Sequence, residues 1–212
     1  MKENNKNNKS TVGNIELPVM EYFYTIQGEG YHQGRAAYFV RLGGCDVGCT
    51  WCDVKESWPM QGHPFMSIDE IVDTVKSSGT EMAVITGGEP LMHNLDELTQ
   101  KLQQQGIETN IETSGSSPLS GHWNWICLSP KKFKAPVPEI LPLANELKII
   151  IYNKTDFAWG EKYAAKVSKN CKLYLQPEWS KADAMMPLIV DHIKQHPRWE
   201  LSLQIHKFIN VP

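Results

Sequence analysis

Three cysteines close together in the chain are the residues best suited to chemistry. Cys45, Cys49 and Cys52 have the spacing C-x3-C-x2-C in a glycine-bearing loop that directly follows the β-type run at 37–42. Thiolates this close can turn inward to one metal centre. Three of them without a fourth nearby leave a coordination position open, which separates a reactive site from a closed structural one. The spacing therefore predicts a [4Fe-4S] cluster with one iron free to bind another group.

Two simpler interpretations of the cysteines compete with this one. A zinc ion would need a fourth ligand from Cys127, Cys171 or a distant histidine, and the local spacing does not supply it. Disulfide bonds are disfavoured, because five cysteines cannot all pair and no signal-peptide pattern precedes the loop. The iron–sulfur interpretation is favoured over both.

The elements around the loop predict a parallel sheet. Short apolar runs alternate with crossover segments, and polar motifs follow the runs, at the carboxyl edge where such sheets place active sites. A capping box of Ser67 and Glu70 opens the first helix. Strands are expected at 35–42, 82–86, 107–112, 125–129, 145–151, 171–176 and 201–206, and helices at 67–78, 94–105, within 155–169 and between 181 and 196.

Two of the expected crossover helices are missing from this pattern. Residues 113–124 are few and rich in Gly, Ser and Pro, and three prolines in 132–144 forbid a regular helix there. We therefore expect an α/β fold, an incomplete, eroded (β/α) barrel. Residues 1–14 are rich in Asn, Lys and Ser and are expected to be disordered, with one domain over 15–212.

A second motif, GGEP at 87–90, follows the expected strand at 82–86. Bare glycines let the backbone approach a ligand closely, and Glu89 offers a charged acceptor for an ammonium group. With the cysteine loop, this motif makes the chain resemble the radical S-adenosylmethionine (SAM) superfamily. The resemblance implies that SAM binds the open iron, that Gly88 and Glu89 contact SAM, and that Trp51 lies beside its adenine.

A closer resemblance is to one family of that superfamily, the 7-carboxy-7-deazaguanine synthases of the queuosine pathway. It rests on collinear motifs: YTIQGEG at 24–30, TGGEP at 86–90, IETSG at 111–115, SPK at 129–131, ELK at 146–148, QP at 176–177 and LQIHKFINVP at 203–212. The resemblance implies a lyase that converts 6-carboxy-5,6,7,8-tetrahydropterin to 7-carboxy-7-deazaguanine with loss of ammonia. Its expected cofactors are a [4Fe-4S] cluster, SAM used catalytically, and Mg2+.

The same resemblance assigns the ligand contacts. The pterin is expected to bind Ile26, Gln27, Gly28, Glu29, Arg41 and Thr86, and the carboxylate of the final residue, Pro212. A carboxylate suits the adjacent N–H donors of an aminopyrimidine edge. Further SAM contacts are expected at Ser129, Pro130, Lys131, Lys148, Gln176, Pro177, Glu178 and Trp179, and supporting or proton-handling roles at His206 and Lys207.

One position departs from the family's pattern. The family generally has threonine two residues after the third cysteine, where its oxygen binds Mg2+, and this chain has Val54. A valine side chain has no oxygen to offer. We therefore expect Mg2+ to be bound by substrate, water or neighbours such as Asp53, and Mg2+ dependence to be reduced.

The composition argues against two classes of partner, nucleic acid and membranes. A net charge of −3 gives no basic footprint for nucleic acid, and no apolar run reaches membrane-spanning length. Free cysteines favour a reducing cytoplasm. The resemblance further implies a homodimer and an electron donor such as flavodoxin. His63, His93, His122, His192 and His196 are taken to have no metal-ligand spacing with one another.

Two other functions are compatible with part of the pattern. A glycyl-radical activase shares the cysteine spacing but would act on a protein and has no use for a carboxylate-bearing tail. A non-catalytic iron–sulfur or zinc protein would need neither GGEP nor the terminal motif. SAM cleavage separates this last class from the two enzymes, and the substrate separates the enzymes from each other.

Overall fold

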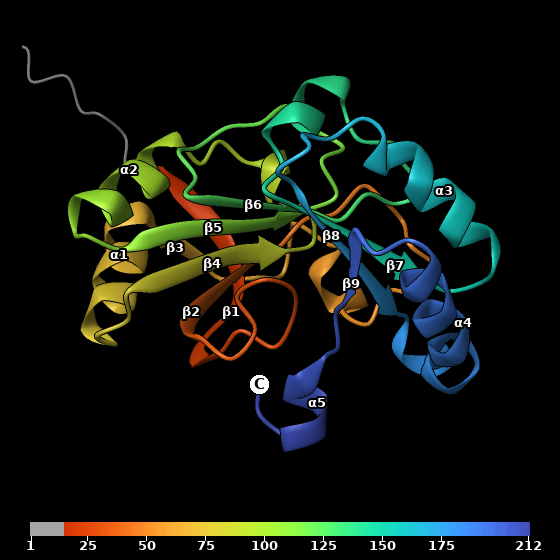
Figure 1. Ribbon diagram of the computed structural model, residues 1–212. Helices are drawn as coiled ribbons and strands as arrows, with labels where there is room; N and C mark the ends of the chain where they lie inside the picture. The colour runs from red at the N-terminus through yellow and green to blue at the C-terminus, as the bar shows by residue number, and fades with distance from the viewer. Residues whose placement is uncertain (1–14) are drawn as a thin grey trace, which may run out of the picture.

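A computed structural model describes residues 15–212, so the prediction made for residues 1–14 lies outside the described part of the chain. One nine-stranded sheet runs through the molecule in the order β3-β1-β2-β4-β5-β6-β7-β8-β9 (Figure 1). From β2 onward neighbouring strands are parallel, while β1 pairs antiparallel with β2 and β3. The strands are β1 Glu16–Ile26, β2 Ala36–Leu42, β3 Phe65–Ser67, β4 Met82–Gly87, β5 Glu108–Thr113, β6 Trp125–Leu128, β7 Glu146–Ile151, β8 Lys172–Pro177 and β9 Trp199–Leu201.

Four longer helices pack on the sheet, α1 and α2 on one side of the view and α3 and α4 on the other (Figure 1). Their bounds are α1 Ile68–Ser77, α2 Asp96–Gln104, α3 Thr155–Ala164 and α4 Ala182–Gln195, with a short α5 at Ile205–Ile209. The predicted capping box is present, since Ser67 Oγ accepts from the Glu70 amide and the Glu70 carboxylate accepts from the Ser67 amide. Among the described residues, no helix combines the length and apolar character needed to cross a membrane.

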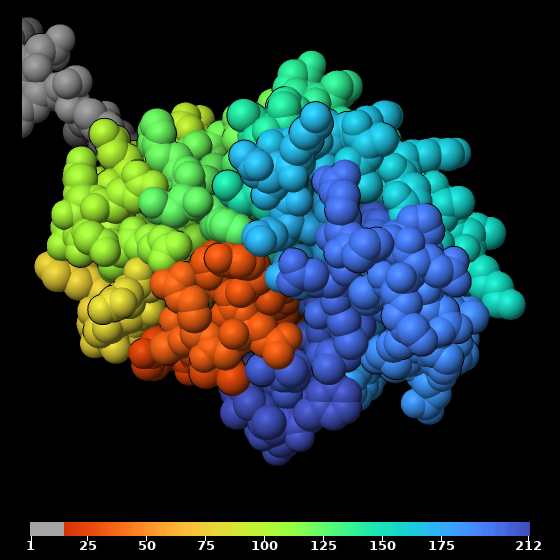
Figure 2. Space-filling model, in the orientation of Figure 1, coloured from red at the N-terminus to blue at the C-terminus, as the bar shows by residue number. Residues whose placement is uncertain are grey.

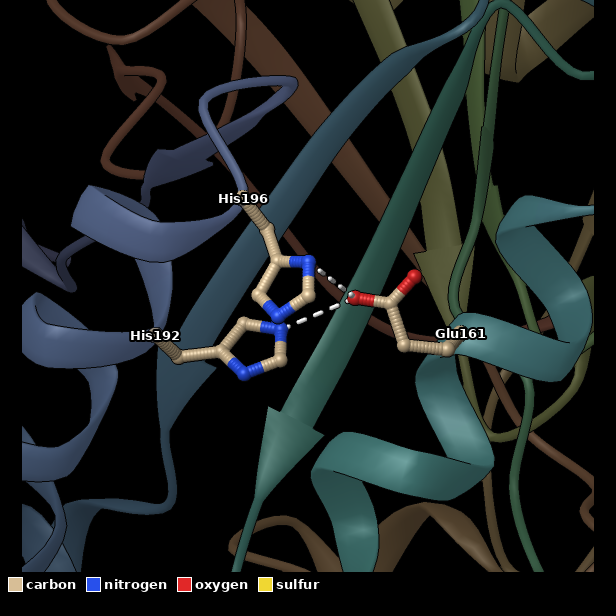
Figure 3. A group of neighbouring side chains, drawn as sticks. All are labelled: Glu161, His192 and His196. Carbon is tan, nitrogen blue, oxygen red and sulfur yellow. Dashed lines mark hydrogen bonds and ion pairs between the residues drawn. The ribbon is translucent and has the colours of Figure 1, made fainter.

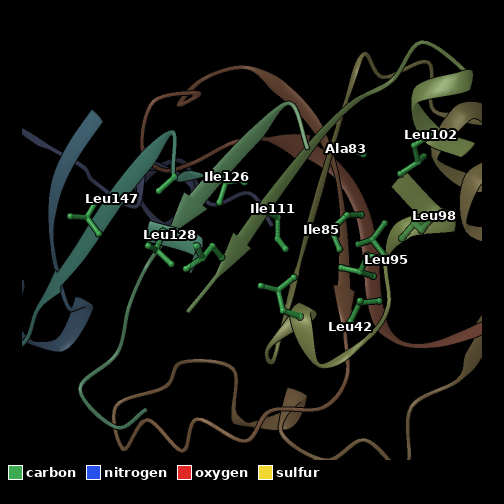
Figure 4. Close-up of a cluster of buried hydrophobic side chains, with 14 of the residues drawn as sticks. Leu42, Ala83, Ile85, Leu95, Leu98, Leu102, Ile111, Ile126, Leu128 and Leu147 are labelled. Carbon is green, nitrogen blue, oxygen red and sulfur yellow. The ribbon is translucent and has the colours of Figure 1, made fainter. Parts of the chain in front are cut away.

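The core lies between the sheet and these helices (Figure 4). Neighbouring parallel strands each contribute fully buried branched side chains, such as Leu42, Ile85 and Ile111. Leu98 and Leu102 of α2 stand one helical turn apart and are also fully buried, so that the helix presents one apolar stripe. Burial of this kind fixes the register of the strands and so the positions of the residues at their carboxyl ends.

The predicted eroded barrel is confirmed. The sheet has two free edges, and no α-helix separates β5 from β6 or β6 from β7 within residues 15–212. A 3-10 helix, η3 at Pro138–Leu143, takes the place of the second crossover helix. Proline lacks the N–H group needed in a helix interior, and η3 begins and continues with Pro138 and Pro142.

The expectation of a strand at 201–206 is wrong. β9 ends at Leu201 and the chain then turns into α5. The alternation of Leu201, Leu203 and Ile205 resembles a strand, but the Ser202 amide donates to the Leu175 carbonyl and the Ile205 amide donates to the Gly28 carbonyl across the molecule. Because the Ile205 amide bonds to Gly28 and not to a strand, the chain leaves the sheet edge after Leu201.

The C-terminal segment joins β8 to the loop after β1. In Figures 1 and 2 the blue C-terminal helix lies beside the orange loop that follows β1. Beyond the Ile205–Gly28 bond, the Gly30 amide donates to Ser202 Oγ at 3.0 Å, and Ser202 Oγ donates to Gln176 Oε1 at 2.7 Å. Chain segments from both ends of the sequence therefore form one wall.

Candidate active site

The cysteine loop is seated on the end of β4. Gly88 donates its amide to the Leu42 carbonyl at 2.9 Å, and Glu89 donates its amide to the Gly44 carbonyl at 2.8 Å. A Cβ on Gly88 would stand 2.2 Å from the Gly44 oxygen and 2.8 Å from Cys45 Cβ. Glycine is required here because the two segments touch through their backbones. The two motifs singled out in the sequence thus form one unit.

All three cysteines of the loop line a cavity of about 270 Å³ and carry free thiols. Burial raises the pKa of the Cys45 thiol and raises that of Cys49 to about 11, although Lys131 works in the opposite direction at Cys49. Metal binding requires thiolates, so cluster assembly must release protons here. Cys127 and Cys171 do not belong to the cavity lining, so neither is positioned as a fourth ligand. The donor set fits a cluster with one open iron.

Glu89 is almost wholly buried and ties β4 to β5. Its Oε1 accepts from the Leu91 amide and Thr113 Oγ1, and its Oε2 accepts from the amide and the hydroxyl of Ser114. Four donors compensate a buried carboxylate well. The carboxylate also lines the cavity, where it adds negative charge next to the cysteine loop.

A buried charge network surrounds Lys148 on β7. Its ammonium forms an ion pair with Glu29 and lies 3.7 Å from Glu112 Oε1. Gln27 Nε2 donates to Glu112 Oε1 at 3.0 Å, and Gln204 Nε2 donates to Glu29 Oε1 at 2.8 Å. Residues from the loop after β1, from β5, from β7 and from the C-terminal segment therefore share one network.

Opposing effects set the ionisation of this network. Burial alone would raise the pKa of Glu29, but Lys148 and hydrogen bonds from Gln204 and Gln176 outweigh it and lower that pKa to about 2. Burial works against the charged form of Lys148, but nearby anionic groups, Glu112 and Glu29 among them, outweigh it and raise its pKa well above the ordinary value. Glu29 and Lys148 are therefore both charged at neutral pH.

Two further basic side chains, Arg41 and Lys131, line the cavity outside this network. Arg41 on β2 lies in register with Thr86 on β4, and its Nε donates to Glu21 Oε1 at 2.6 Å. Lys131 donates to Ser129 Oγ at 2.7 Å, and burial lowers its pKa. Both are available to an anionic ligand, Arg41 as a planar fork and Lys131 as a point charge.

Aromatic rings pack against Trp51 of the cysteine loop and against Trp179 after β8. Trp51 stacks on Tyr152, with ring centroids 6.4 Å apart and an interplanar angle of 15°, and meets Phe133 edge-on at 6.1 Å. Trp179 after β8 meets Phe208 of α5 at 5.4 Å. Trp51 and Trp179 both line the cavity and offer flat apolar faces to a ligand ring.

The C-terminus reaches the same cavity. Pro212 and His206 line it, and the Val211 amide donates to the His206 carbonyl at 3.1 Å. A Cβ on Gly28 would stand 2.1 Å from His206 Nδ1, so the imidazole lies directly against the Gly28 backbone. Burial lowers the pKa of His206. The last residues are thus packed against the loop that precedes Glu29.

Most of the residues that the sequence singled out are brought together. The cavity lining contains Ile26, Gln27, Gly28, Glu29, Arg41, Cys45, Cys49, Trp51, Cys52, Val54, Thr86, Gly88, Glu89, Ser129, Lys131, Lys148, Gln176, Pro177, Glu178, Trp179, His206 and Pro212. Pro130 and Lys207 are outside it. Lys207 instead pairs with Asp53 at 3.1 Å and lies 5.0 Å from the Trp179 ring centroid.

Several lining residues were missed as individual candidates. Glu112, Thr113 and Ser114 belong to the motif IETSG, which was noted without roles, and Gln204 belongs to the terminal motif. Their position directly after a strand of a parallel sheet was the available signal. Phe23 and Phe39 also line the cavity, and the alternation of β1 and β2 points them inward.

Comparisons with known proteins show what the chain is similar to. The radical SAM superfamily profile matches residues 39–126. The chain is 56% identical to a 7-carboxy-7-deazaguanine synthase of Flavobacterium psychrophilum, and the match covers 92% of this chain and 93% of the relative. It is 49% identical to a 7-carboxy-7-deazaguanine synthase of Synechocystis sp., with 93% of this chain and 94% of the relative covered. A 7-carboxy-7-deazaguanine synthase of Escherichia coli K12 is 34% identical, and the match covers 93% of this chain and 100% of the relative. The crystal structure of QueE from Escherichia coli superposes with a TM-score of 0.81 at 31% identity, covering 89% of this chain and 93% of that one.

Proposed function

The chain belongs to the 7-carboxy-7-deazaguanine synthase family of the radical SAM superfamily, and we infer that it is itself such a lyase. It converts 6-carboxy-5,6,7,8-tetrahydropterin to 7-carboxy-7-deazaguanine with loss of ammonia, in the biosynthesis of queuosine and related 7-deazapurines. Cys45, Cys49 and Cys52 would hold the cluster, which together with SAM would supply 5′-deoxyadenosyl radical chemistry for hydrogen abstraction at C6 and ring contraction.

One observation carries this function: the cysteine loop, the charged residues Glu29, Arg41 and Lys148, and the C-terminal Pro212 all line a single cavity. Cys45, Cys49 and Cys52 are positioned to hold the cluster, with Glu89 and the β4 end beside them. Residues of the loop after β1 and the final Pro212 stand around the remaining space. An electron-transfer protein would need no such chamber.

We propose the following contacts for the substrate. Arg41 binds the carboxylate of the pterin, where its fork suits a planar anion. The terminal carboxylate of Pro212 accepts from the N–H groups of the aminopyrimidine edge, and Gln27 and Glu29 hold the ring from the side. The charged pair of Glu29 and Lys148 supports this proposal because it fixes Glu29 as an ionised acceptor.

SAM takes the other half of the chamber in this proposal. Gly88 and Glu89 face its amino group, Ser129 and Lys131 its carboxylate and ribose, and Trp51 its adenine. The stacking of Trp51 on Tyr152 supports the last contact, since it fixes the indole plane before a ligand binds. Gln176 and the residues up to Trp179 complete this side.

Val54 lines the cavity at the position where the family's Mg2+-binding threonine is expected, and its side chain has no oxygen to bind the ion. We propose that Mg2+ is held by substrate and water, with help from Asp53, a carboxylate of the lining that directly precedes Val54 in the chain. Asp53 already pairs with Lys207, which weakens its attraction for a cation.

We further propose that the enzyme works in the cytoplasm as a homodimer and takes electrons from a small donor such as flavodoxin. Its five free thiols support a reducing compartment. Exposed Tyr22 and Tyr24 stack on either side of Tyr38, an aromatic surface of β1 and β2 that supports a contact with a second copy. Sedimentation of the loaded enzyme tests the dimer.

The activity is tested with reconstituted enzyme under anaerobic conditions. Dithionite, SAM and 6-carboxytetrahydropterin are added, and the deazaguanine product is followed by mass spectrometry. We expect product from the parent and none from Cys49→Ala. SAM cleavage without this product would retain the radical chemistry but reject the substrate, as an activase would require. Neither cleavage nor product from a cluster-loaded chain would reject the enzyme assignment.

A further inference from the structure

Two histidines and one glutamate meet on the outer side of the molecule, between α3 and α4 (Figure 3). His192 and His196 stand one turn apart on α4 and just beyond its end, and Glu161 projects from α3. His192 Nε2 lies 2.9 Å from Glu161 Oε1, and His196 Nδ1 lies 3.9 Å from the same oxygen. The view that these histidines lack ligand spacing is therefore wrong, because an i, i+4 pair places both rings on one face.

We propose that Glu161, His192 and His196 form a site for a transition-metal dication, with Zn2+ as the expected ion. One ligand atom from each of the three lies within 4.8 Å of the other two. Ligands 2.0–2.1 Å from a tetrahedral ion are separated by roughly 3.4 Å. This value falls between the two observed nitrogen–oxygen distances, and one nitrogen from each histidine lies within 4.8 Å of the other, so the two rings must move toward each other to hold an ion.

The donor set selects the class of metal. Two imidazoles and one carboxylate suit Zn2+, Cu2+ and Ni2+, whereas Mg2+ prefers oxygen ligands. Three protein ligands leave a fourth tetrahedral position for water. His196 and Glu161 are about half and two-fifths exposed, at 48% and 40%, so water and ions have access.

The carboxylate is oriented from behind by a buried group. Trp199, only 2% exposed, donates its indole N–H to Glu161 Oε1 at 2.8 Å. Ligating carboxylates are commonly held by such outer hydrogen bonds. His192 is fixed in turn by Phe157, with ring centroids 4.9 Å apart, and by the stacked ring of His196 at 4.3 Å. The carboxylate is thus oriented before any ion binds, and the two stacked rings must turn relative to each other so that both nitrogen lone pairs point at one ion.

This site is separate from the chemistry of the cavity. None of its three residues belongs to the cavity lining. It joins α3, which packs on β7, to α4, which packs on β8 and β9. A bound ion would therefore cross-link the half of the barrel that carries Lys148 and Gln176, and would stabilise it without entering the reaction.

The test is zinc binding by the cluster-loaded enzyme, in which Cys45, Cys49 and Cys52 are occupied. Zn2+ is partitioned anaerobically between the enzyme and a chromogenic chelator. We expect one zinc equivalent bound with a dissociation constant in the micromolar range or below, unaffected by millimolar Mg2+. The melting temperature should rise with Zn2+. His196→Ala and Glu161→Gln should each weaken binding at least tenfold.

The matched control is His122→Ala, which removes an exposed histidine from a loop elsewhere and should bind zinc like the parent. His196→Ala removes a half-exposed ring, and Glu161→Gln keeps an oxygen that can accept from Trp199, so both should fold. Circular dichroism checks this. Equal zinc stoichiometry and affinity in the parent and both variants, or no binding by the parent below millimolar zinc, would overturn the proposal.

Discussion

Replacing Lys148 by methionine tests the buried charge network most directly. The substitution keeps an apolar stem of similar length but removes the ammonium that faces Glu29 and Glu112. Glu29 has its pKa lowered from 4.5 to about 2, and Lys148 is the principal stabilising partner. At about 1.4 kcal/mol per pKa unit this difference corresponds to roughly 3 kcal/mol. Removing one partner of a buried ion pair generally costs about 3–5 kcal/mol, and we expect a loss of about 3 kcal/mol for Lys148→Met.

Urea unfolding of the reduced, cluster-free chain measures this cost. With a denaturant slope of about 2 kcal/mol per molar, a loss of 3 kcal/mol lowers the midpoint by roughly 1.5 M. The pKa of Glu29 is depressed in the folded chain, so its contribution is present above pH 4.5 and is lost as the pH falls toward 2. Parent and Lys148→Met stabilities should therefore approach each other in acid.

A double-mutant cycle separates the ion pair from other effects of the lysine. Glu29→Gln combined with Lys148→Met removes the uncompensated charge, and we expect the double variant to recover at least about 1 kcal/mol relative to Lys148→Met alone. A loss below about 1 kcal/mol in Lys148→Met, together with coupling under about 0.5 kcal/mol, would refute the reasoning. It would mean that the pair is solvated in solution and does not fix Glu29.

Three further predictions concern the cavity wall and the metal. Gly28→Ala places a methyl group 2.1 Å from His206 Nδ1 and should therefore displace α5. We expect KM for the pterin to rise by a larger factor than kcat falls. Unchanged kinetics would exclude this close approach. A short extension beyond Pro212 should abolish product formation, while SAM binding, measured by equilibrium dialysis, should persist. Native-like activity of the extended chain would contradict the role of the terminal carboxylate. Activity with and without chelator should show weak Mg2+ stimulation in the parent and stronger stimulation in Val54→Thr; strong dependence in the parent would refute the reduced requirement.

The sequence was sufficient for much of the sheet because local signals and burial agree. The strand predicted at 82–86 is β4 at Met82–Gly87, and the helix predicted at 67–78 is α1 at Ile68–Ser77. Capping side chains and continuous apolar runs carry this information within a few residues. The missing crossover helices were equally predictable, because prolines act through their own covalent structure.

Long-range contacts explain what sequence reasoning missed. The end of the chain alternates like a strand, and only its bonds to Gly28 and Gly30, far away in sequence, turn it into a loop and α5. Glu112 looked like an ordinary strand residue, and its pairing with Gln27 and Lys148 appears only when three segments converge. The histidine pair on α4 was visible as an i, i+4 spacing, but its glutamate comes from another helix.

The openness of the sheet explains why the chain's last residues take part in the site. In the described part of the chain β1 and β9 do not pair, and the pairing of β9 with β8 ends at Leu175 and Leu201, so no strand joins the carboxyl end of β8 to the loop after β1. Ser202 links them by accepting from the Gly30 amide and donating to Gln176, and α5 then packs against Gly28. This segment runs along the cavity between the two, and Pro212 at its end therefore lines the same cavity as the cysteine loop.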